Sequence, residues 1–416
     1  MTRRLRNRPR SVPRRLQSRP GFAMFMALGA LVIIAVLVAG SSFITLQESQ
    51  LGQNQLVQSR AFAAAEYGLN KIQADWDKTP NLQMANGANF DTTYTLTGQG
   101  TCKVRYTRLN NETFWLVSEG RAFIGATQLA SRTAVKRVSA ILRLRIPTIK
   151  AEAAVTTNGD IKVQGSPLLD GNNNDPPNWT GTCPSPKAPN KPGIVLPPGE
   201  IPDIQKASLV TGTPQYVQSA VAANPETYVR FGDETWNTLR ASANHVNTTG
   251  GTINGGTPSY ITGTTDCNKN DPNNWGEPWR SGASYKANCV NYFPILFFTC
   301  TPPPPPTGTN TSCTVHFSGG RGQGILLVDG NIQMNGNFEW YGLIVVTGVI
   351  QKANGTANIY GSVMAANADI GPVGTDPASE ALGNLTIKYS ACGIERAMRG
   401  SAQVVQAKSR SFVELY

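Results

Sequence analysis

Residues 22–47 read FAMFMALGALVIIAVLVAGSSFITLQ, an uncharged stretch without proline. A helix needs about 20 apolar residues to span the hydrocarbon core of a membrane. The helical pattern continues to about Trp76, and one helix of that length would be about 80 Å long. We therefore predict a long helix over residues 22–78. Its first part, 22–46, is expected to span a membrane, and its second part to lie outside.

The segment before this stretch, residues 1–21, is strongly basic. It contains no acidic residue and has arginine at positions 3, 4, 6, 8, 10, 14, 15 and 19. Positive charge beside an apolar span keeps that side in the cytoplasm, so the rest of the chain is expected to be exported. A cleaved secretory signal is one alternative, but no convincing small-x-small site separates the apolar run from Glu48, because the helical pattern continues. An uncleaved single-span anchor is another.

Residues 21–69 resemble the N-terminal module of PilX-type minor type IV pilins and related pseudopilins. The resemblance rests on Gly21-Phe22 as a prepilin peptidase site, on the apolar run 23–40, on Leu46-Gln47-Glu48 and on the block AFAAAEYGL at 61–69. In this family the leader is cut after the glycine and the new amino terminus is methylated. The resemblance therefore implies that residues 1–21 are a prepilin-type leader and that Phe22 is the first mature residue.

The resemblance also implies a location and partners. It indicates a protein of the bacterial inner membrane with a single span, a cytoplasmic N-terminus and a periplasmic or extracellular bulk. After assembly the chain would lie in a pilus or on the cell surface. Its partners would be prepilin peptidase, the inner membrane, and other pilins or pseudopilins bound through the N-terminal helix.

Met26 is a departure from the family pattern. Most pilins carry glutamate at this fifth mature position, where it neutralises the terminal amine of a neighbouring subunit. Because a lone carboxylate is costly in lipid, its absence is tolerated in the membrane. The departure favours a minor subunit over the repeating one.

Charge and composition describe an exported protein rich in turns. The eight leader arginines account for +8 of the formal net charge of +11, which leaves +3 for the other residues. That balance argues against nucleic acid as a partner. With 41 glycines, 28 prolines and only 15% charged residues, the exported part is expected to be rich in strands and loops.

Two β-rich regions are predicted after the helix. Residues 88–148 contain short alternating strands and a turn at Asn110-Asn111, which predict a small antiparallel sheet packed on the helix. Farther along, GILLVDGNIQ from Gly324 recurs as GLIVVTGVIQ from Gly342 and more loosely as GSVMAANADI from Gly361. Short apolar strands with glycine at fixed spacing indicate a parallel β-solenoid-like domain, although an antiparallel sandwich is an alternative.

The remaining boundaries follow from this repeat. Residues 151–169 contain a similar glycine-x-isoleucine sequence at Gly159 and are expected to stack, as a first coil, on coils within 322–395. Residues 170–321, with five prolines at 302–306, are expected to form a large loop-rich insertion, and residues 396–416 a C-terminal tail. The predicted fold class is thus α+β and mostly β: a long transmembrane helix, a small antiparallel sheet and a parallel β-solenoid-like domain with an insertion.

Two loops share the pattern D-x-N-x-N-D-P-x-N-W, at 170–179 and 266–275. Oxygen side chains at alternate positions are how calcium loops present ligands. The candidate calcium ligands are therefore Asp170, Asn172, Asn174, Asp266, Asn268 and Asn270. Neither loop has the glycine and glutamate of an EF-hand, and duplicated Asx turns closed by a tryptophan explain the pattern without metal. No other cofactor is indicated.

Seven cysteines, at 102, 183, 267, 289, 300, 313 and 392, lie in the exported part, where disulfides persist. An odd number leaves at least one unpaired in a monomer. We expect at least one disulfide among Cys289, Cys300 and Cys313, because short loops close at low entropic cost. Their pairing stays open.

Catalytic patterns are weak in this sequence. The acidic residues are scattered singly, and neither a G-x-S-x-G elbow nor a nucleotide-binding glycine loop occurs in a strand-to-helix context. We therefore expect a structural minor pilin-like subunit, not an enzyme. It would take part in assembling a type IV pilus or a type II secretion pseudopilus, at or near the tip. The alternatives are a membrane-anchored surface adhesin and a β-helix carbohydrate-active enzyme.

Overall fold

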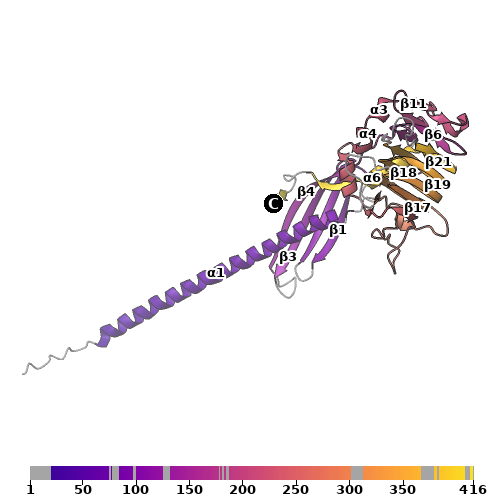
Figure 1. The fold of residues 1–416 in the computed structure, drawn as a ribbon. Helices are drawn as coiled ribbons and strands as arrows, with labels where there is room; N and C mark the ends of the chain where they lie inside the picture. Colours follow the sequence, from indigo (N-terminus) through magenta and orange to yellow (C-terminus); the bar gives the residue numbers. More distant parts are fainter. Residues whose placement is uncertain are drawn as a thin grey trace, which may run out of the picture.

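The computed structural model describes residues 20–74, 76, 84–96, 100–124, 132–177, 179, 182–183, 187–300, 313–366, 379–381, 384–407 and 413–415. The predicted leader lies outside this set, apart from its last two residues. Figure 1 shows a long helix that leads into an antiparallel sheet, with a larger head of parallel strands beyond it.

Helix α1 runs without interruption from Pro20 to Ala74. Buried side chains begin at Val57 and then recur every three or four positions, at Ala61, Ala64, Ala65, Leu69 and Ile72. That spacing defines one face of a helix, and this face packs on the antiparallel sheet. Residues 22–56 are exposed, so about 50 Å of helix projects beyond the sheet (Figure 1). The expected end of the helix at residue 78 lies outside the described residues.

The antiparallel sheet lies against the second half of α1. Its first four strands pair in sequence order and are β1 Asn89–Leu96, β2 Gly100–Arg108, β3 Thr113–Ile124 and β4 Arg132–Arg145. Trp76 packs edge-on against Phe114 in the core between sheet and helix, which also holds Val104, Leu116, Val138 and Leu142. The sheet thus covers its apolar face with the helix.

The C-terminal residues complete this sheet, which corrects the expectation of a tail over 396–416. Strands β22 Gln403–Gln406 and β23 Val413–Leu415 both pair antiparallel with β4. The tail assignment was wrong because strands of four and three residues carry almost no pattern of their own. They form because the free edge of β4 offers unpaired backbone groups.

The head is built around three long parallel strands, β17 Thr314–Asp329, β18 Asn331–Val346 and β19 Ile350–Ala365. Their register places Gly324 beside Gly342 and Gly342 beside Gly361, which is the alignment of the sequence repeat. Gly342 has a φ of +137°, and a Cβ there would overlap the carbonyl oxygen of Gly324. Glycine is therefore required where the stacked backbones turn.

Shorter strands extend the parallel sheet on both sides, to 12 strands within the described residues. Beyond β19 lie β5 Val155–Thr157, β7 Leu168–Asp170, β8 Ile194–Leu196, β10 Val210–Thr211, β11 Tyr216–Gln218 and β21 Asn384–Tyr389. Beyond β17 lie β14 His245–Asn247, β15 Gly251–Asn254 and β16 Ile295–Thr299. Residues 155–170 thus contribute strands on the side of the last long strand, where β5 pairs with β19 and β7 pairs with β21.

The segment 170–321 differs from the expected loop-rich insertion. It supplies strands to both ends of the parallel sheet, and β17 begins at Thr314, before the expected boundary at 322. Apart from β17, the strands of this segment contain two to five residues within glycine-, asparagine- and proline-rich sequence. Strands this short have no periodic pattern from which they could be predicted. They form because their backbone groups hydrogen-bond to a neighbouring parallel strand.

The remaining elements are short. Three parallel strands form a separate small sheet, β6 Ile161–Val163, β9 Asp203–Ile204 and β20 Ser379–Ala381, and two form a hairpin, β12 Arg230–Phe231 and β13 Glu234–Thr235. The helices are α3 Ala220–Ala223, α4 Glu226–Val229, α5 Trp236–Ala241 and α6 Ala391–Gly400, and the 3-10 turns are η1 Ala207–Leu209 and η2 Ala287–Cys289.

Inside the head, Trp275 contacts Phe298, Phe317 and Trp340 edge-on. This aromatic cluster fills the core between the long strands.

Candidate assembly helix and head loops

The first part of the projecting helix, residues 22–40, is apolar around its whole circumference. None of its most apolar window, of mean hydropathy 2.8, is buried inside the protein, and by length and composition it can cross a membrane. Phe22, Phe25 and Met26 are 72%, 77% and 63% exposed. Soluble monomers rarely expose an apolar surface of this size, so lipid or the helices of other proteins must cover it.

The predicted processing site lies at the free end of this helix. Gly21 and Phe22 both belong to the first turn of α1. Met26 follows one turn later, and no charged residue occurs between Phe22 and Gln47. The structure therefore places the candidate cleavage site and the substituted fifth position together, at the end of α1 farthest from the head (Figure 1). Cleavage and methylation stay predictions.

The block AFAAAEYGL at 61–69 has a structural role in this fold. Its small residues face the sheet, and a Cβ on Gly68 would lie 2.9 Å from Val104 and 3.1 Å from the Cys102 sulfur. Small side chains let the backbones of helix and sheet approach closely. This segment therefore fixes how the sheet sits on the helix, while residues 22–56 stay available for assembly.

The outer face of the antiparallel sheet carries paired charges around an exposed Trp115. Asp91 forms ion pairs with Arg105 at 2.7 Å and Lys103 at 2.8 Å, and these hydrogen bonds hold the pKa of Asp91 well below its usual range. Arg121 and Arg137 each lie 2.7 Å from Glu119. A groove of about 420 Å³ runs between the two clusters. Exposed pairs like these contribute little to stability, so the face is a solvated surface with a surplus of cations.

The first candidate calcium loop is organised around the Asp170 carboxylate. One carboxylate oxygen accepts hydrogen bonds from the Asn172 backbone at 3.0 Å and from Thr211 Oγ1 at 2.7 Å. The other accepts one from Asn174 Nδ2 at 2.9 Å. Burial raises the pKa of Asp170, and these hydrogen bonds more than offset it, so the pKa is lowered overall. The three candidate ligands thus meet in an Asx turn.

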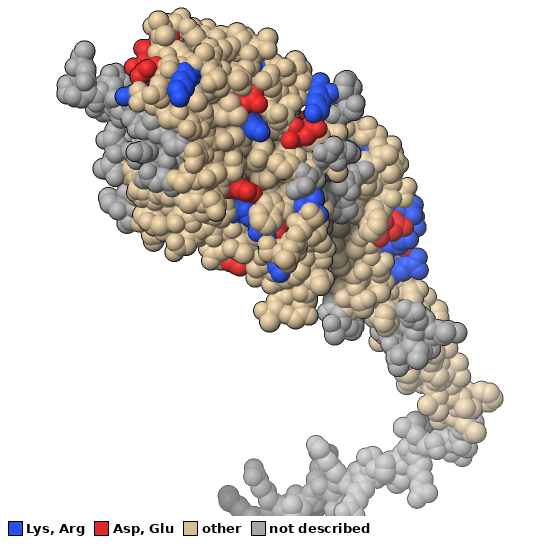
Figure 2. All heavy atoms as spheres, turned by 90° about the vertical axis from the view of Figure 1, so that its right-hand side faces the viewer, with Lys and Arg blue, Asp and Glu red and all other residues tan. Residues whose placement is uncertain are grey.

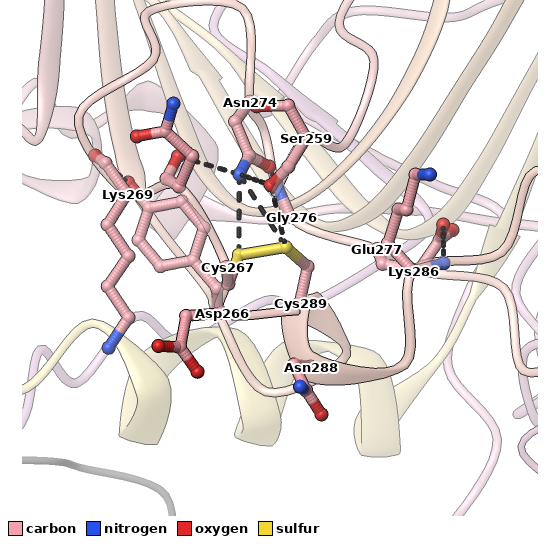
Figure 3. The surroundings of a disulfide bond; sticks show 12 residues. Ser259, Asp266, Cys267, Lys269, Asn274, Gly276, Glu277, Lys286, Asn288 and Cys289 are labelled. Carbon is pink, nitrogen blue, oxygen red and sulfur yellow. Dashed lines mark hydrogen bonds between the residues drawn. A yellow bond between two sulfur atoms is a disulfide. The ribbon is translucent and has the colours of Figure 1, made fainter. Parts of the chain in front are cut away.

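The second candidate loop is organised differently. Asp266 bonds through its backbone N–H to Thr264 Oγ1, and Asn268 Oδ1 accepts the N–H of Asn270 at 3.3 Å. The buried side chain at its centre is Asn274, whose Nδ2 donates to the carbonyls of Ser259 and Asn268 at 3.2 and 2.8 Å (Figure 3). Sequence reasoning missed Asn274, although the shared N-W ending of both loops was a signal.

Metal binding by these loops stays a prediction. Among the described residues, no three His, Cys, Asp or Glu side chains gather as a metal site would require. Asparagine and backbone oxygens, which calcium also uses, dominate both loops.

Three disulfides join segments of the head. Cys300 is bonded to Cys313, which lies within the predicted trio, whereas Cys289 is bonded to Cys267 at the edge of the second loop (Figure 3). The third bond joins Cys183 to Cys392 across 209 positions and attaches the first loop region to α6. Cys102 is a buried free thiol beneath α1.

No family model and no curated protein matches this chain. A solved structure to which it is similar is the competence-associated pilin ComZ from Thermus thermophilus, with 12% identity, a TM-score of 0.22, and 87% of this chain and 97% of that chain covered. A TM-score this low does not establish a common fold.

Proposed function

We propose that this chain is a structural minor pilin-like subunit that takes part in assembling a type IV pilus or a type II secretion pseudopilus. The observation that carries the proposal is α1, because the second part of a continuous helix is docked on a sheet, whereas residues 22–46 are uncharged, mostly apolar and uncovered. Such a half-helix can lie in lipid before assembly and against the apolar helices of neighbouring subunits afterwards.

The orientation in the membrane follows from the charge of residues 1–21. The eight arginines stay in the cytoplasm, so the sheet and the head lie on the exported side of the inner membrane. In this proposal prepilin peptidase cuts between Gly21 and Phe22, and the new terminus is methylated. Oxidation of six of the seven cysteines fits an exported head.

The head favours a position at or near the tip of a filament. We infer that its parallel strands are coils of a short β-solenoid, since equivalent glycines stack in register along β17, β18 and β19. A rigid body of this size hinders lateral packing between repeating subunits. A subunit at the tip has no neighbour above it, so it can lack the glutamate that Met26 replaces. Acidic and basic side chains lie scattered in small groups over the visible face of the protein (Figure 2), and the proposed role is structural, without catalysis.

Mass spectrometry of the chain recovered from sheared filaments tests this function. We expect a mature protein that begins with methylated Phe22, and recovery of intact Met1 or Thr2 in filaments would refute the proposal. Gly21→Leu should block cleavage and leave the precursor in the inner membrane. Gly29→Ala is the matched control, because it alters the same helix without touching the cleavage site.

A further inference from the structure

Two arginines from distant parts of the head share one tryptophan. The guanidinium carbon of Arg280 lies 4.7 Å from the ring centroid of Trp179, and that of Arg396 lies 4.9 Å from the same centroid. Trp179 is fully buried, and its Nε1 donates to the carbonyl of Pro278 at 2.7 Å. The ring therefore has a fixed position, and both guanidinium groups contact it.

The carboxylates closest in sequence to these arginines are already engaged. Glu277, which is fully buried, forms a two-point pair with Arg321 at 3.0 and 2.9 Å. Glu395 pairs with Arg399 at 2.8 Å. Over the parts of the chain that the structure describes, neither Arg280 nor Arg396 forms an ion pair. Their hydrogen bonds go to neutral carbonyls, those of Glu277 and Trp279 for Arg280 and that of Thr182 for Arg396.

Both cations are partly removed from water. Burial lowers the pKa of Arg280 to about 10, with a further contribution from the charge of Arg396 and partial opposition from Glu277. Burial lowers the pKa of Arg396 as well, and Glu395 partly opposes it. Two like charges held close together in a half-buried place are unfavourable unless an anion accompanies them. Each guanidinium has five N–H donors, so donors remain after the carbonyl contacts.

We propose that Arg280 and Arg396 form a binding site for an oxyanion group, that is, a carboxylate, sulfate or phosphate. A planar guanidinium matches the geometry of such groups, and two of them around one ring can bind the same anion. The half-buried Tyr360 lies against Tyr341 in a tilted arrangement, with ring centroids 4.9 Å apart, and Tyr341 in turn stacks on Trp179. The group can therefore belong to a free ion or to an acidic sugar, whose ring would contact Tyr360.

A disulfide holds the two walls of this site together. Cys183 follows Trp179 by four residues, and its partner Cys392 precedes Arg396 by four residues on α6. The site is thus preorganised by a covalent link, and it does not depend on the pilin-like role of α1.

Thermal melting of the full chain in a non-ionic detergent tests the site. Millimolar sulfate, phosphate or galacturonate should raise the melting temperature of the natural chain above that in sodium chloride of equal ionic strength. Arg280→Gln and Arg396→Gln should each abolish the rise. The rise in each variant is measured from its own melting temperature without oxyanion, because each substitution also removes a contact with Trp179.

Arg399→Gln is the matched control, since Arg399 lies on the same helix and is already paired with Glu395. It should keep the full rise. A larger rise with galacturonate than with sulfate or phosphate would assign the ligand to acidic sugars, and the reverse order to free ions. No rise beyond sodium chloride, or an equal loss of the rise in Arg399→Gln, would overturn the site. Either result leaves cleavage at Gly21 untouched as a separate test of the pilin-like function.

Discussion

Gly120 on β3 lies directly against the backbone of Ala61 on α1. A Cβ built on Gly120 would overlap the Ala61 carbonyl oxygen and the Ala65 nitrogen. No side chain can be added there unless the helix moves away from the sheet. The packing distance between the helix and the antiparallel sheet is therefore set by a glycine on one side and alanines on the other.

Gly120→Ala should accordingly destabilise the antiparallel sheet on its helix. Overpacking against backbone costs roughly 1–3 kcal/mol. Urea unfolding of the full chain in detergent measures the change. Gly52→Ala in the same helix meets nothing within 4 Å and should be neutral or stabilising. Equal losses in both variants would contradict this packing.

The disulfides should differ in their effect on stability according to loop length. In the chain-entropy model the Cys183–Cys392 bond, which spans 209 positions, contributes up to about 5 kcal/mol, and the Cys300–Cys313 bond, which spans 13, about 3 kcal/mol. The double Ser variant of the first pair should therefore unfold at a lower urea concentration than that of the second pair. The opposite order would show that loop closure does not dominate.

Calcium should stabilise the head if the two D-x-N-x-N loops bind it. A ligand at a hundredfold excess over its dissociation constant adds about 2.7 kcal/mol to the free energy of unfolding. We expect a higher melting temperature in millimolar calcium than in chelator, and Asp170→Asn and Asp266→Asn should each reduce the shift. An unchanged melting temperature in the natural chain would leave the Asx turns as purely structural.

Acidification should weaken the head through His245. Burial lowers the pKa of His245, although Asp271 opposes the effect, and the Tyr292 hydroxyl lies 3.0 Å from its Nε2. Because the folded pKa is below the ordinary value of about 6.5, the contribution to stability is complete above that pH and is lost as the pH falls through the folded pKa. His245→Gln should reduce the fall in melting temperature below about pH 6.5. Tyr292→Phe, which retains the imidazole, should not.

Met26→Glu separates a tip subunit from a repeating one. A tip subunit gains nothing from the added carboxylate, which is costly in lipid by roughly 2.5–3.5 kcal/mol when unpaired. Filament number, counted by electron microscopy in cells that carry the variant, should therefore not increase. More filaments, with the chain spaced along them, would instead identify a repeating component.

Backbone constraints explain what the sequence could predict. The repeat at Gly324 and Gly342 shows in the sequence because stacked strands need glycine wherever their backbones meet. The long helix could be predicted because an apolar run without proline has few other stable conformations. In both cases the structural constraint acts on neighbouring residues, so it is visible in a short stretch of sequence.

Long-range pairing explains what the sequence could not predict. The joining of β22 to β4 depends on where the head returns the chain, and nothing within Gln403–Gln406 indicates it. Arg280, Arg396 and Trp179 come from three separate segments of the chain and contact one another only in the folded head. Cys183 and Cys392, which form a disulfide, are 209 positions apart. Such contacts exist only once the sheets have formed.

The chain leaves the antiparallel sheet after Arg145 and re-enters it at Gln403, and these two residues are direct partners in the β4–β22 ladder. A head that is pulled outward therefore loads two adjacent strands at the same end and along their length. The hydrogen bonds between β4 and β3 then share the force together instead of opening one at a time. The connection between head and sheet, through the adjacent strands β4 and β22, is therefore suited to resist mechanical tension.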